Sequence, residues 1–372
     1  MLYWLFIEQE LLSDVLPGTN VFRYLSFRTA WGMLTSLAIT YVMFPWFIEW
    51  MKSRKAAQII RKDGPESHLL QKVGTPTMGG VVLLVGVVVS TLLWARLDTP
   101  LVWMVLAVLV GYGLIGLYDD FLKVSKKTTD GLAGRLKIVG QLLFGGGALL
   151  YGWYSGAISS TLTLPFLRDM DLDFTALWVG APSLGLLYVA FALFVVVGAS
   201  NAVNLTDGLD GLAIGPVMTS ASTYALLAYL VGNARFATYL GIPYIESAGE
   251  VAILGMAIVG AGLGFLWFNA YPAQIFMGDV GSLSLGGTLA MMAVVTKHEV
   301  LLAIVGGIFV LETVSVILQV GSFKMTGRRI FLMAPIHHHY EKKGWSEPKI
   351  IVRFWIISIV LALVALSTLK LR

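Results

Sequence analysis

The sequence has 372 residues, of which 57% are hydrophobic and only 13% are charged. A soluble domain cannot cover that much apolar surface, and the apolar residues come in runs long enough to cross a bilayer. The absence of cysteine excludes disulfides, thiolate catalysis and cysteine-based metal sites. The composition therefore predicts an all-α integral membrane protein in which residues 1–372 form a single polytopic domain.

In chain order, residues 1–20 form a short amphipathic segment, which we expect to lie at the membrane interface. About ten apolar runs follow, and each has a length that predicts a transmembrane helix. These runs cover residues 29–50, 77–95, 100–118, 138–154, 175–197, 211–231, 251–268, 282–296, 300–320 and 354–369. No loop between them is long enough to fold as a separate domain.

The basic residues predict which way the chain crosses the membrane. Most of the 26 Lys and Arg residues lie in the loops after the first, third and ninth spans. Because cytoplasmic loops of membrane proteins carry an excess of Lys and Arg, we expect these loops to face the cytoplasm. Both termini then lie on the outer, periplasmic side. Every polar cluster described below falls at the cytoplasmic face, where we expect the active site.

The most polar cluster lies between the fifth and sixth spans. Its sequence is Asn201-Ala-Val-Asn204-Leu-Thr206-Asp207-Gly208-Leu-Asp210-Gly211-Leu-Ala213. Ionisable groups at the mouth of a membrane helix are costly and mark a functional site by default. The two glycines predict a tight or interrupted backbone that another group approaches closely. The alternative is a solvated helix end in which Asn and Asp act as caps.

Two adjacent carboxylates, Asp119 and Asp120, end the third span. Beside lipid they repel each other and lose solvation, so they need a cation to remain charged. Lys123 is one candidate for that cation and a divalent metal is another. The alternative is a water-exposed helix end, although a carboxylate there opposes the helix dipole. We therefore favour a functional role for the pair.

A third carboxylate, Asp279, lies in Phe276-Met-Gly278-Asp279-Val-Gly281-Ser282 at the start of the eighth span. A carboxylate is stable at a helix N-terminus, so a simple capping role is a strong alternative. The flanking glycines leave room for a phosphate or a nucleotide. Asn269, at the end of the seventh span, lies just upstream.

Two further clusters contain basic or hydroxyl side chains. The run Ala334-Pro335-Ile336-His337-His338-His339 lies in the last cytoplasmic loop. Consecutive side chains point apart and no His-Glu-x-x-His pair is present, so phosphate contact or acid–base chemistry is favoured over zinc. The run from Lys72 to Gly80 includes Thr77 and suits an anionic phosphate, but this signal is weak alone.

Together these clusters bring five acids to the cytoplasmic face, with lysines and histidines beside them. The acids are Asp119, Asp120, Asp207, Asp210 and Asp279. Magnesium is usually held by one or two carboxylates together with substrate phosphates. The set therefore predicts Mg²⁺-assisted phosphoryl transfer rather than proton pumping, whose relays would cross the bilayer midplane. Glu312 is the main acid inside a span.

Four motifs occur together in a characteristic order: Asp-Asp-x-x-Lys, Asn-x-x-Asn-x-Thr-Asp-Gly-x-Asp-Gly-Leu-Ala, Met-Gly-Asp-x-Gly-Ser and Ala-Pro-Ile-His-His-His. From about Phe22 to the C-terminus, the sequence resembles the polyprenyl-phosphate N-acetylhexosamine-1-phosphate transferases. It is most similar to their branch in bacterial peptidoglycan synthesis. That resemblance implies transfer of phospho-N-acetylmuramoyl-pentapeptide from UDP-MurNAc-pentapeptide to undecaprenyl phosphate, giving lipid I and UMP.

The resemblance also implies residue roles, a location and partners. It makes Asp119, Asp120, Asp279 and His337 catalytic, with Asp279 the Mg²⁺ ligand. It places the following residues at the substrates: Lys72, Thr77, Lys123, Lys137, Asn201, Asn204, Asp207, Asp210, Asn269, Phe276, Gly278, His338 and His339. Arg135 competes with Lys137 for its role. We expect a homodimer in the bacterial cytoplasmic (inner) membrane, with no nucleic-acid partner.

Two other functions remain open at this point. A sister enzyme would transfer GlcNAc-1-phosphate from UDP-GlcNAc with the same acids, but the Pro-Ile-His-His-His run argues for the muramoyl substrate. An ion-coupled transporter would need polar sites at the membrane midplane on discontinuous helices, typically in paired repeats. The sequence shows neither feature.

Overall fold

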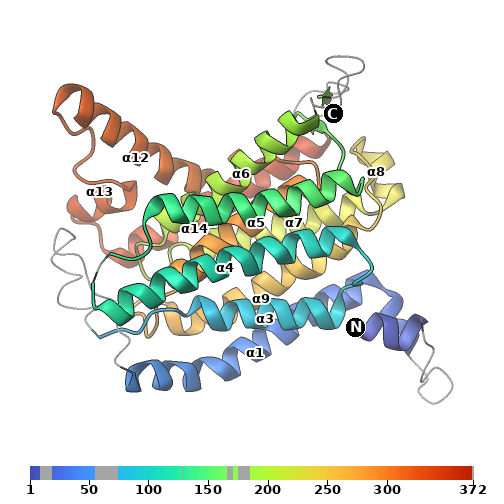
Figure 1. Ribbon diagram of the computed structural model, residues 1–372, viewed down its shortest axis with the longest axis horizontal. Helices are drawn as coiled ribbons and strands as arrows, with labels where there is room; N and C mark the ends of the chain where they lie inside the picture. Colours follow the sequence, from blue (N-terminus) through green and yellow to red (C-terminus); the bar gives the residue numbers. More distant parts are fainter. Residues whose placement is uncertain (9–18, 55–73, 129, 166–170, 175–184, 371–372) are drawn as a thin grey trace.

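The structure is a computed structural model that describes residues 1–8, 19–54, 74–128, 130–165, 171–174 and 185–370. Its long helices lie side by side (Figure 1). They are α1 Leu25–Ser53, α3 Gly80–Trp94, α4 Pro100–Lys126, α5 Gly134–Tyr154, α6 Gly185–Thr206, α7 Ile214–Val231, α9 Val251–Asn269, α10 Gly278–Val295, α12 Gly307–Thr326 and α14 Glu347–Ser367. Shorter helices are α8 Ala234–Leu240, α11 Leu302–Val305 and α13 Ile336–Lys342.

Single helical turns complete the helical structure, and a small hairpin stands beside it. The turns are η1 Trp4–Glu8, η2 Thr19–Arg23, η4 Ala248–Glu250 and η5 Thr368–Lys370. The strands β1 Thr161–Thr163 and β2 Asp171–Asp173 pair antiparallel, with Thr161 opposite Asp173. This hairpin departs from the all-α prediction, because strands of three residues are too short to show a detectable alternation of polar and apolar side chains.

Eight of the described helical segments are long and apolar enough to cross a membrane. They contain α1, α4, α6, α7, α9, α10, α12 and α14. α3 is apolar but shorter. Each predicted run overlaps a long helix, although the fifth run begins at residues 175–184, which lie outside the described residues. The fold is thus that of a helical integral membrane protein.

Local sequence signals explain where several helices begin. Pro100 opens α4 and Pro348 lies in the first turn of α14, where a missing backbone N–H costs no helical hydrogen bond. Asn233 caps α8 by accepting hydrogen bonds from the backbone N–H groups of Arg235 and Phe236. Proline and asparagine therefore act at these ends as their chemistry predicts.

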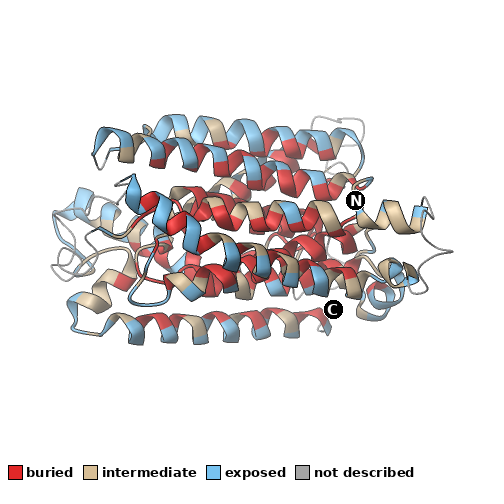
Figure 2. Cartoon of the chain, turned by 90° about the horizontal axis from the view of Figure 1, so that it is seen from below, coloured by how far each residue is buried: buried red, intermediate tan, exposed pale blue. Residues whose placement is uncertain are grey.

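The centre of the bundle is α10, which packs against α4 and α6. Its sequence alternates small residues with leucines, so neighbouring helices approach closely and bury almost all of it. α9 packs against α1 and α7 in the same way. Figure 2 shows the buried residues along the inner helices and the exposed ones on the outer faces. The apolar outer faces of α12 and α14 suit contact with lipid.

The two ends of the bundle differ in what they carry. Both chain termini are marked at one end, and α13 lies at the other (Figure 1). The Met1 ammonium donates to Leu92 O near the end of α3, and the Lys370 ammonium donates to Tyr239 O in α8. The C-terminal part of α4 and the start of α10 lie at the end opposite the termini. This opposite end holds the predicted site.

Candidate active site

Three carboxylates meet where the last turns of α4 face the first turn of α10. Asp119 and Asp120 come from α4 and Asp279 from α10. One oxygen of each lies within 4.8 Å of the others. The alternative of a water-exposed helix end is wrong for the two α4 acids. α4 continues to Lys126, and Asp119 is 0% exposed inside it.

Two lysines pair with all three acids. The Lys123 ammonium lies 2.5 Å from Asp119 Oδ2, 3.5 Å from Asp120 Oδ1 and 3.3 Å from Asp279 Oδ1. The Lys137 ammonium, from the first turn of α5, lies 2.9 Å from Asp119 Oδ1 and 2.6 Å from Asp279 Oδ2. Arg135 is exposed, so Lys137 is the basic residue of α5 in the cluster. With all five groups ionised, the cluster keeps one net negative charge.

Backbone groups fix the directions of the carboxylates. Leu132 N donates to Asp119 Oδ1 at 2.6 Å, and Val280 N donates to Asp120 Oδ2 at 3.3 Å. Gly278 has a φ of +75°, and a Cβ there would overlap Asp120 Oδ2, so glycine suits this position. The N-cap of α10 is Met277 and Asp279 lies two residues further on, so Asp279 is not the cap.

This cluster has the chemistry of a divalent-metal site. Hard cations prefer carboxylate oxygens, and an excess of negative charge favours a bound cation. Asp119 Oδ2 is buried against the Lys123 ammonium, and its carboxylate lies within reach of the other two acids. Among the described residues, these three acids form the one group of at least three His, Cys, Asp or Glu side chains with metal-binding spacing. The residues therefore fit a divalent cation.

The polar segment 201–213 lies beside this cluster. As its glycines predicted, the backbone is interrupted there, because α6 ends at Thr206 and α7 begins at Ile214. Asn204 Oδ1 accepts a 2.8 Å hydrogen bond from Ser282 Oγ, one turn after Asp279 in α10. Asn201 Nδ2 donates to Gln141 Oε1 at 3.0 Å. These contacts join α6 to α10 and α5, while Asp207 is half-buried in the turn.

Two residues predicted to lie at the substrates, Asp210 and Asn269, connect the turn to the loop that follows α9. Asp210 Oδ2 accepts from Ala273 N at 2.9 Å. Asn269 Oδ1 accepts from Gly211 N at 2.8 Å, and its Nδ2 donates to Ile275 O at 2.7 Å. Both side chains are buried. These bonds account for both residues structurally, and a contact with nucleotide stays a prediction.

The segment before α3 lies against the segment before α10. Phe276 N donates to Pro76 O at 2.9 Å, and Gly79 N donates to Phe276 O at 2.9 Å. Thr77 is buried between them, close to Gly278. The structure thus brings Thr77 and Phe276 next to the acids. Lys72 lies outside the described residues.

The three histidines face three different partners. His337 is buried and its Nδ1 lies 3.1 Å from Glu312 Oε1. His338 Nδ1 lies 2.6 Å from Glu341 Oε2. His339 Nδ1 accepts a 3.1 Å hydrogen bond from Leu332 N, and burial together with the Lys343 ammonium lowers the pKa of its imidazole. The side chains therefore diverge, as expected for neighbours in sequence.

Three residues in these contacts were not predicted as site residues. Gln141 and Ser282 tie α5 and α10 to the polar segment. Ser282 ends the Met-Gly-Asp-x-Gly-Ser motif, whereas no local pattern distinguishes Gln141 from other polar residues in helices. The sequence did indicate that Glu312 is unusual, because it is an acid inside a predicted membrane span. The missing information was its partner, which lies in a different helix.

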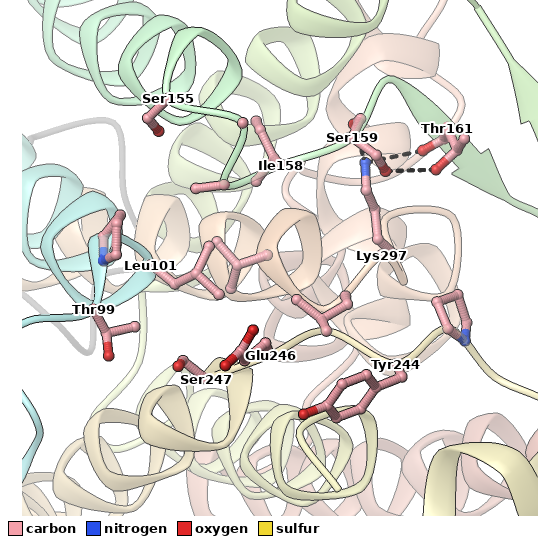
Figure 3. Close-up of a pocket in the computed structure, with 16 residues that line it drawn as sticks. Thr99, Leu101, Ser155, Ile158, Ser159, Thr161, Tyr244, Glu246, Ser247 and Lys297 are labelled. Atoms are coloured by element: carbon pink, nitrogen blue, oxygen red, sulfur yellow. Dashed lines mark hydrogen bonds between the residues drawn. The ribbon is translucent and has the colours of Figure 1, made fainter. Parts of the chain in front are cut away.

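A cavity lies beside the start of α4, at the other end of the bundle, and Figure 3 shows the side chains that line it. It has a volume of about 470 Å³ and is lined by hydroxyl groups, Glu246 and Lys297. The Lys297 ammonium donates to Ser159 O at 2.5 Å and Thr161 O at 3.0 Å, and burial lowers its pKa to about 8. α4 begins beside this cavity and reaches Asp119 about 28 Å further on. This cavity is thus separate from the acid cluster.

The fold and the site define a multi-pass membrane protein with an acidic, lysine-paired cluster at one membrane face. Residues 102–297 match the family described as glycosyl transferase family 4, and the chain belongs to this family. The motif resemblance is confirmed by relatives from Geobacter sp. (strain M21) and Citrifermentans bemidjiense. Each is named phospho-N-acetylmuramoyl-pentapeptide-transferase and is 56% identical over 353 residues, which cover 95% of this chain and 96% of the relative.

Proposed function

We propose that the protein transfers phospho-N-acetylmuramoyl-pentapeptide from UDP-MurNAc-pentapeptide to undecaprenyl phosphate, giving lipid I and UMP. The observation that carries this proposal is the 56% identity to transferases of that name over 95% of the chain. This reaction is the first membrane step of peptidoglycan synthesis. It places the protein in the bacterial cytoplasmic membrane as a multi-pass enzyme.

The position of the cluster suits this reaction. A water-soluble nucleotide sugar and a lipid phosphate can meet only at a membrane surface. We propose ten spans with both termini outside, which puts the cluster at the cytoplasmic face, where the nucleotide sugar is made. The basic loops after the first, third and ninth spans support that orientation.

We assign Mg²⁺ to the acid cluster, with Asp279 as its principal protein ligand and Asp119 and Asp120 beside it. When bound, Mg²⁺ would offset the negative charge that develops on the transferred phosphate and on the departing UMP. Lys123 and Lys137 form ion pairs with the acids, which offsets the repulsion between them. The two ammonium groups also add positive charge where two anionic substrates meet. The net negative charge of the cluster supports this assignment.

Two chemical routes are possible, and we favour direct attack. In a covalent route, Asp119 or Asp120 would attack the β-phosphate and release UMP before the lipid arrives. In direct attack, an oxygen of the lipid phosphate displaces UMP in one step. A phosphate monoester oxygen is largely ionised near neutral pH and needs little activation. Both α4 acids are already engaged by ammonium or backbone N–H groups, which suits steering better than attack.

The substrate assignment is tested with purified protein, Mg²⁺, undecaprenyl phosphate and each UDP-sugar in turn. We expect UMP release with UDP-MurNAc-pentapeptide and none with UDP-GlcNAc. Release with UDP-GlcNAc alone would instead identify the sister activity. Omitting the lipid is the control, because direct attack cannot release UMP without an acceptor.

The route is tested by isotope exchange in enzyme stripped of polyprenyl phosphate. Labelled UMP is incubated with unlabelled UDP-MurNAc-pentapeptide and Mg²⁺. We expect no label to enter the UDP-sugar. Exchange that persists without lipid, and that disappears in Asp119→Asn or Asp120→Asn, would establish the covalent route.

We also propose that the enzyme is a homodimer, as the family resemblance implies. Light scattering on the protein in a detergent of known micelle mass should give a protein mass near twice that of one chain. A mass of one chain at working concentrations would contradict the proposal.

A further inference from the structure

Glu312 is a buried acid with no part in the acid cluster. It lies in the second turn of α12, where it is the one acid of that helix, and it is 0% exposed. An ionisable side chain inside a membrane helix is costly and is retained for a reason. Its neighbour is His337 of α13, whose Nδ1 lies 3.1 Å from Glu312 Oε1. His337 is equally buried.

This pair is incompletely hydrogen-bonded. Both carboxylate oxygens of Glu312 and both ring nitrogens of His337 lack a hydrogen-bond partner among the described residues. The 3.1 Å contact has the length of a hydrogen bond but not its alignment, as is common for catalytic groups before substrate binds. A buried pair kept only for stability would be satisfied. The missing partners therefore point to a ligand.

The other ring nitrogen of His337 faces the polar turn. A Cβ at Gly208 would overlap His337 Nε2, so the absence of a side chain at 208 lets the imidazole approach. Gly208 lies between Asp207 and Asp210, and this turn is tied to α10 through Asn204 and Ser282. The imidazole thus lies between Glu312, which its Nδ1 faces, and the turn at Gly208, which its Nε2 faces.

α12 also holds the loop that carries His337. Gln319, two turns after Glu312, accepts from Ile330 N at 3.0 Å and Phe331 N at 2.9 Å. Its amide donates to Phe331 O at 3.0 Å. The loop from α12 to α13 is therefore fixed to α12 itself. Glu312 and His337 keep their relative positions because both depend on one helix.

We propose that Glu312 is a positioning residue that fixes the tautomer of His337. An ionised carboxylate can only accept, so His337 Nδ1 carries the proton that faces it. In the neutral ring Nε2 is then the acceptor. The imidazole presents that lone pair, at the Gly208 turn, to a proton-bearing oxygen of the substrate. This inference rests on the proposed function, because it takes the substrate to lie at this turn.

The tautomer can be measured without substrate. We would record ¹⁵N spectra of protein labelled at histidine, in detergent, at a pH where the ring is neutral. The His337 signals are identified by their loss in His337→Gln. We expect a protonated Nδ1 and an unprotonated Nε2 in the unmodified protein. Glu312→Gln should give a mixture of tautomers, because an amide can donate or accept.

A matched control removes the carboxylate from the neighbouring histidine. Glu341→Gln alters the partner of His338 and should leave the His337 signals unchanged. A protonated Nε2 in the unmodified protein, or a His337 tautomer unaffected by Glu312→Gln, would overturn the proposal. If Glu312→Gln does not fold, the same spectra are recorded for Glu312→Asp. This variant keeps the charge and should retain the Nδ1–H form, so a loss of that form would overturn the proposal.

Kinetics separate positioning from a structural role. Glu312→Gln should lower kcat about 100-fold with little change in KM, and Glu312→Asp should restore part of the loss. The double variant Glu312→Gln/His337→Gln should be no slower than His337→Gln alone, because Glu312 acts through His337. A loss of kcat in the double variant equal to the product of the two single losses would contradict this. If the unmodified protein released no UMP, the proposed function would fail while the spectra still tested the pair.

Discussion

Buried ionic clusters stand at both ends of the bundle, and they are built differently. At the end that carries the chain termini, Arg28 binds Glu250 through two contacts of 2.6 and 2.7 Å, with side chains 3% and 8% exposed. Arg28 also donates to Trp94 O, and Arg96 N donates to Glu250. One guanidinium pairs with one carboxylate, so the charges of this buried pair balance.

The cluster at the opposite end is unbalanced and open. Three carboxylates share two ammonium groups. The side chains of Lys123, Lys137 and Asp279 are 28%, 18% and 15% exposed, so a ligand can reach them. Buried charge alone therefore does not distinguish a ligand-binding site from a structural ion pair. Charge imbalance and access do.

The largest expected effect on activity is at Asp279. Asp279→Asn keeps the shape of the side chain but removes the charge that we assign to the metal. Turnover should fall about 1,000-fold or more, with the folded fraction unchanged in gel filtration. UMP release at several Mg²⁺ concentrations measures this. Near-normal turnover with an unaltered Mg²⁺ dependence would show that Asp279 does not hold the metal, and the cluster would then be no more than a structural ion pair.

At the end that carries the chain termini, the expected effect is on stability. Glu250→Gln leaves the Arg28 charge buried without its counter-ion, which costs about 3–5 kcal/mol. The midpoint of thermal unfolding in detergent should drop by several degrees. The protein that remains folded should turn over at the rate of the unmodified enzyme. A turnover defect with an unchanged midpoint would show that this pair belongs to the catalytic machinery.

A smaller effect separates the two basic residues of α5. Lys137→Ala removes an ammonium that contacts two of the acids and should lower turnover about 100-fold. Arg135→Ala is the matched control, because Arg135 is exposed two residues away. Its rate should stay within about twofold of the unmodified enzyme, as surface substitutions usually do. Equal losses from both substitutions would contradict the observed pairing.

The last prediction alters no interaction of the cluster. The orientation that we propose puts Glu246 outside and Lys342 in the cytoplasm, and both are exposed. Single cysteines at these positions can be labelled in a chain that has none of its own. An impermeant thiol reagent added to intact cells should label Glu246→Cys and not Lys342→Cys. The reverse labelling pattern would show that the protein has the opposite orientation in the membrane.

Much of the site could be predicted because charge is rare in so apolar a chain. The acids at 119, 120 and 279 stood out for that reason, and the glycines correctly predicted the interrupted backbone after Thr206. Helix ends were harder. Hydropathy reports the bilayer core, whereas α4 continues through polar residues to Lys126.

Long-range pairing could not be predicted at all. The choice between Lys137 and Arg135 depends on how α5 is rotated against α4, which no local pattern records. The contact between Glu312 and His337 depends on how the loop after α12 folds back. These partners are set by tertiary packing. A sequence can show that such residues are unusual, but not which residue each one meets.

The central claim is that the unbalanced cluster holds a divalent metal and the balanced one does not. Mn²⁺ binds oxygen ligands as Mg²⁺ does and is detected by electron paramagnetic resonance. Titration of the purified protein should show a saturable Mn²⁺ site that Mg²⁺ displaces. That site should disappear in Asp279→Asn and remain in Glu250→Gln. A site that survives in Asp279→Asn, or is lost in folded Glu250→Gln, would contradict the account.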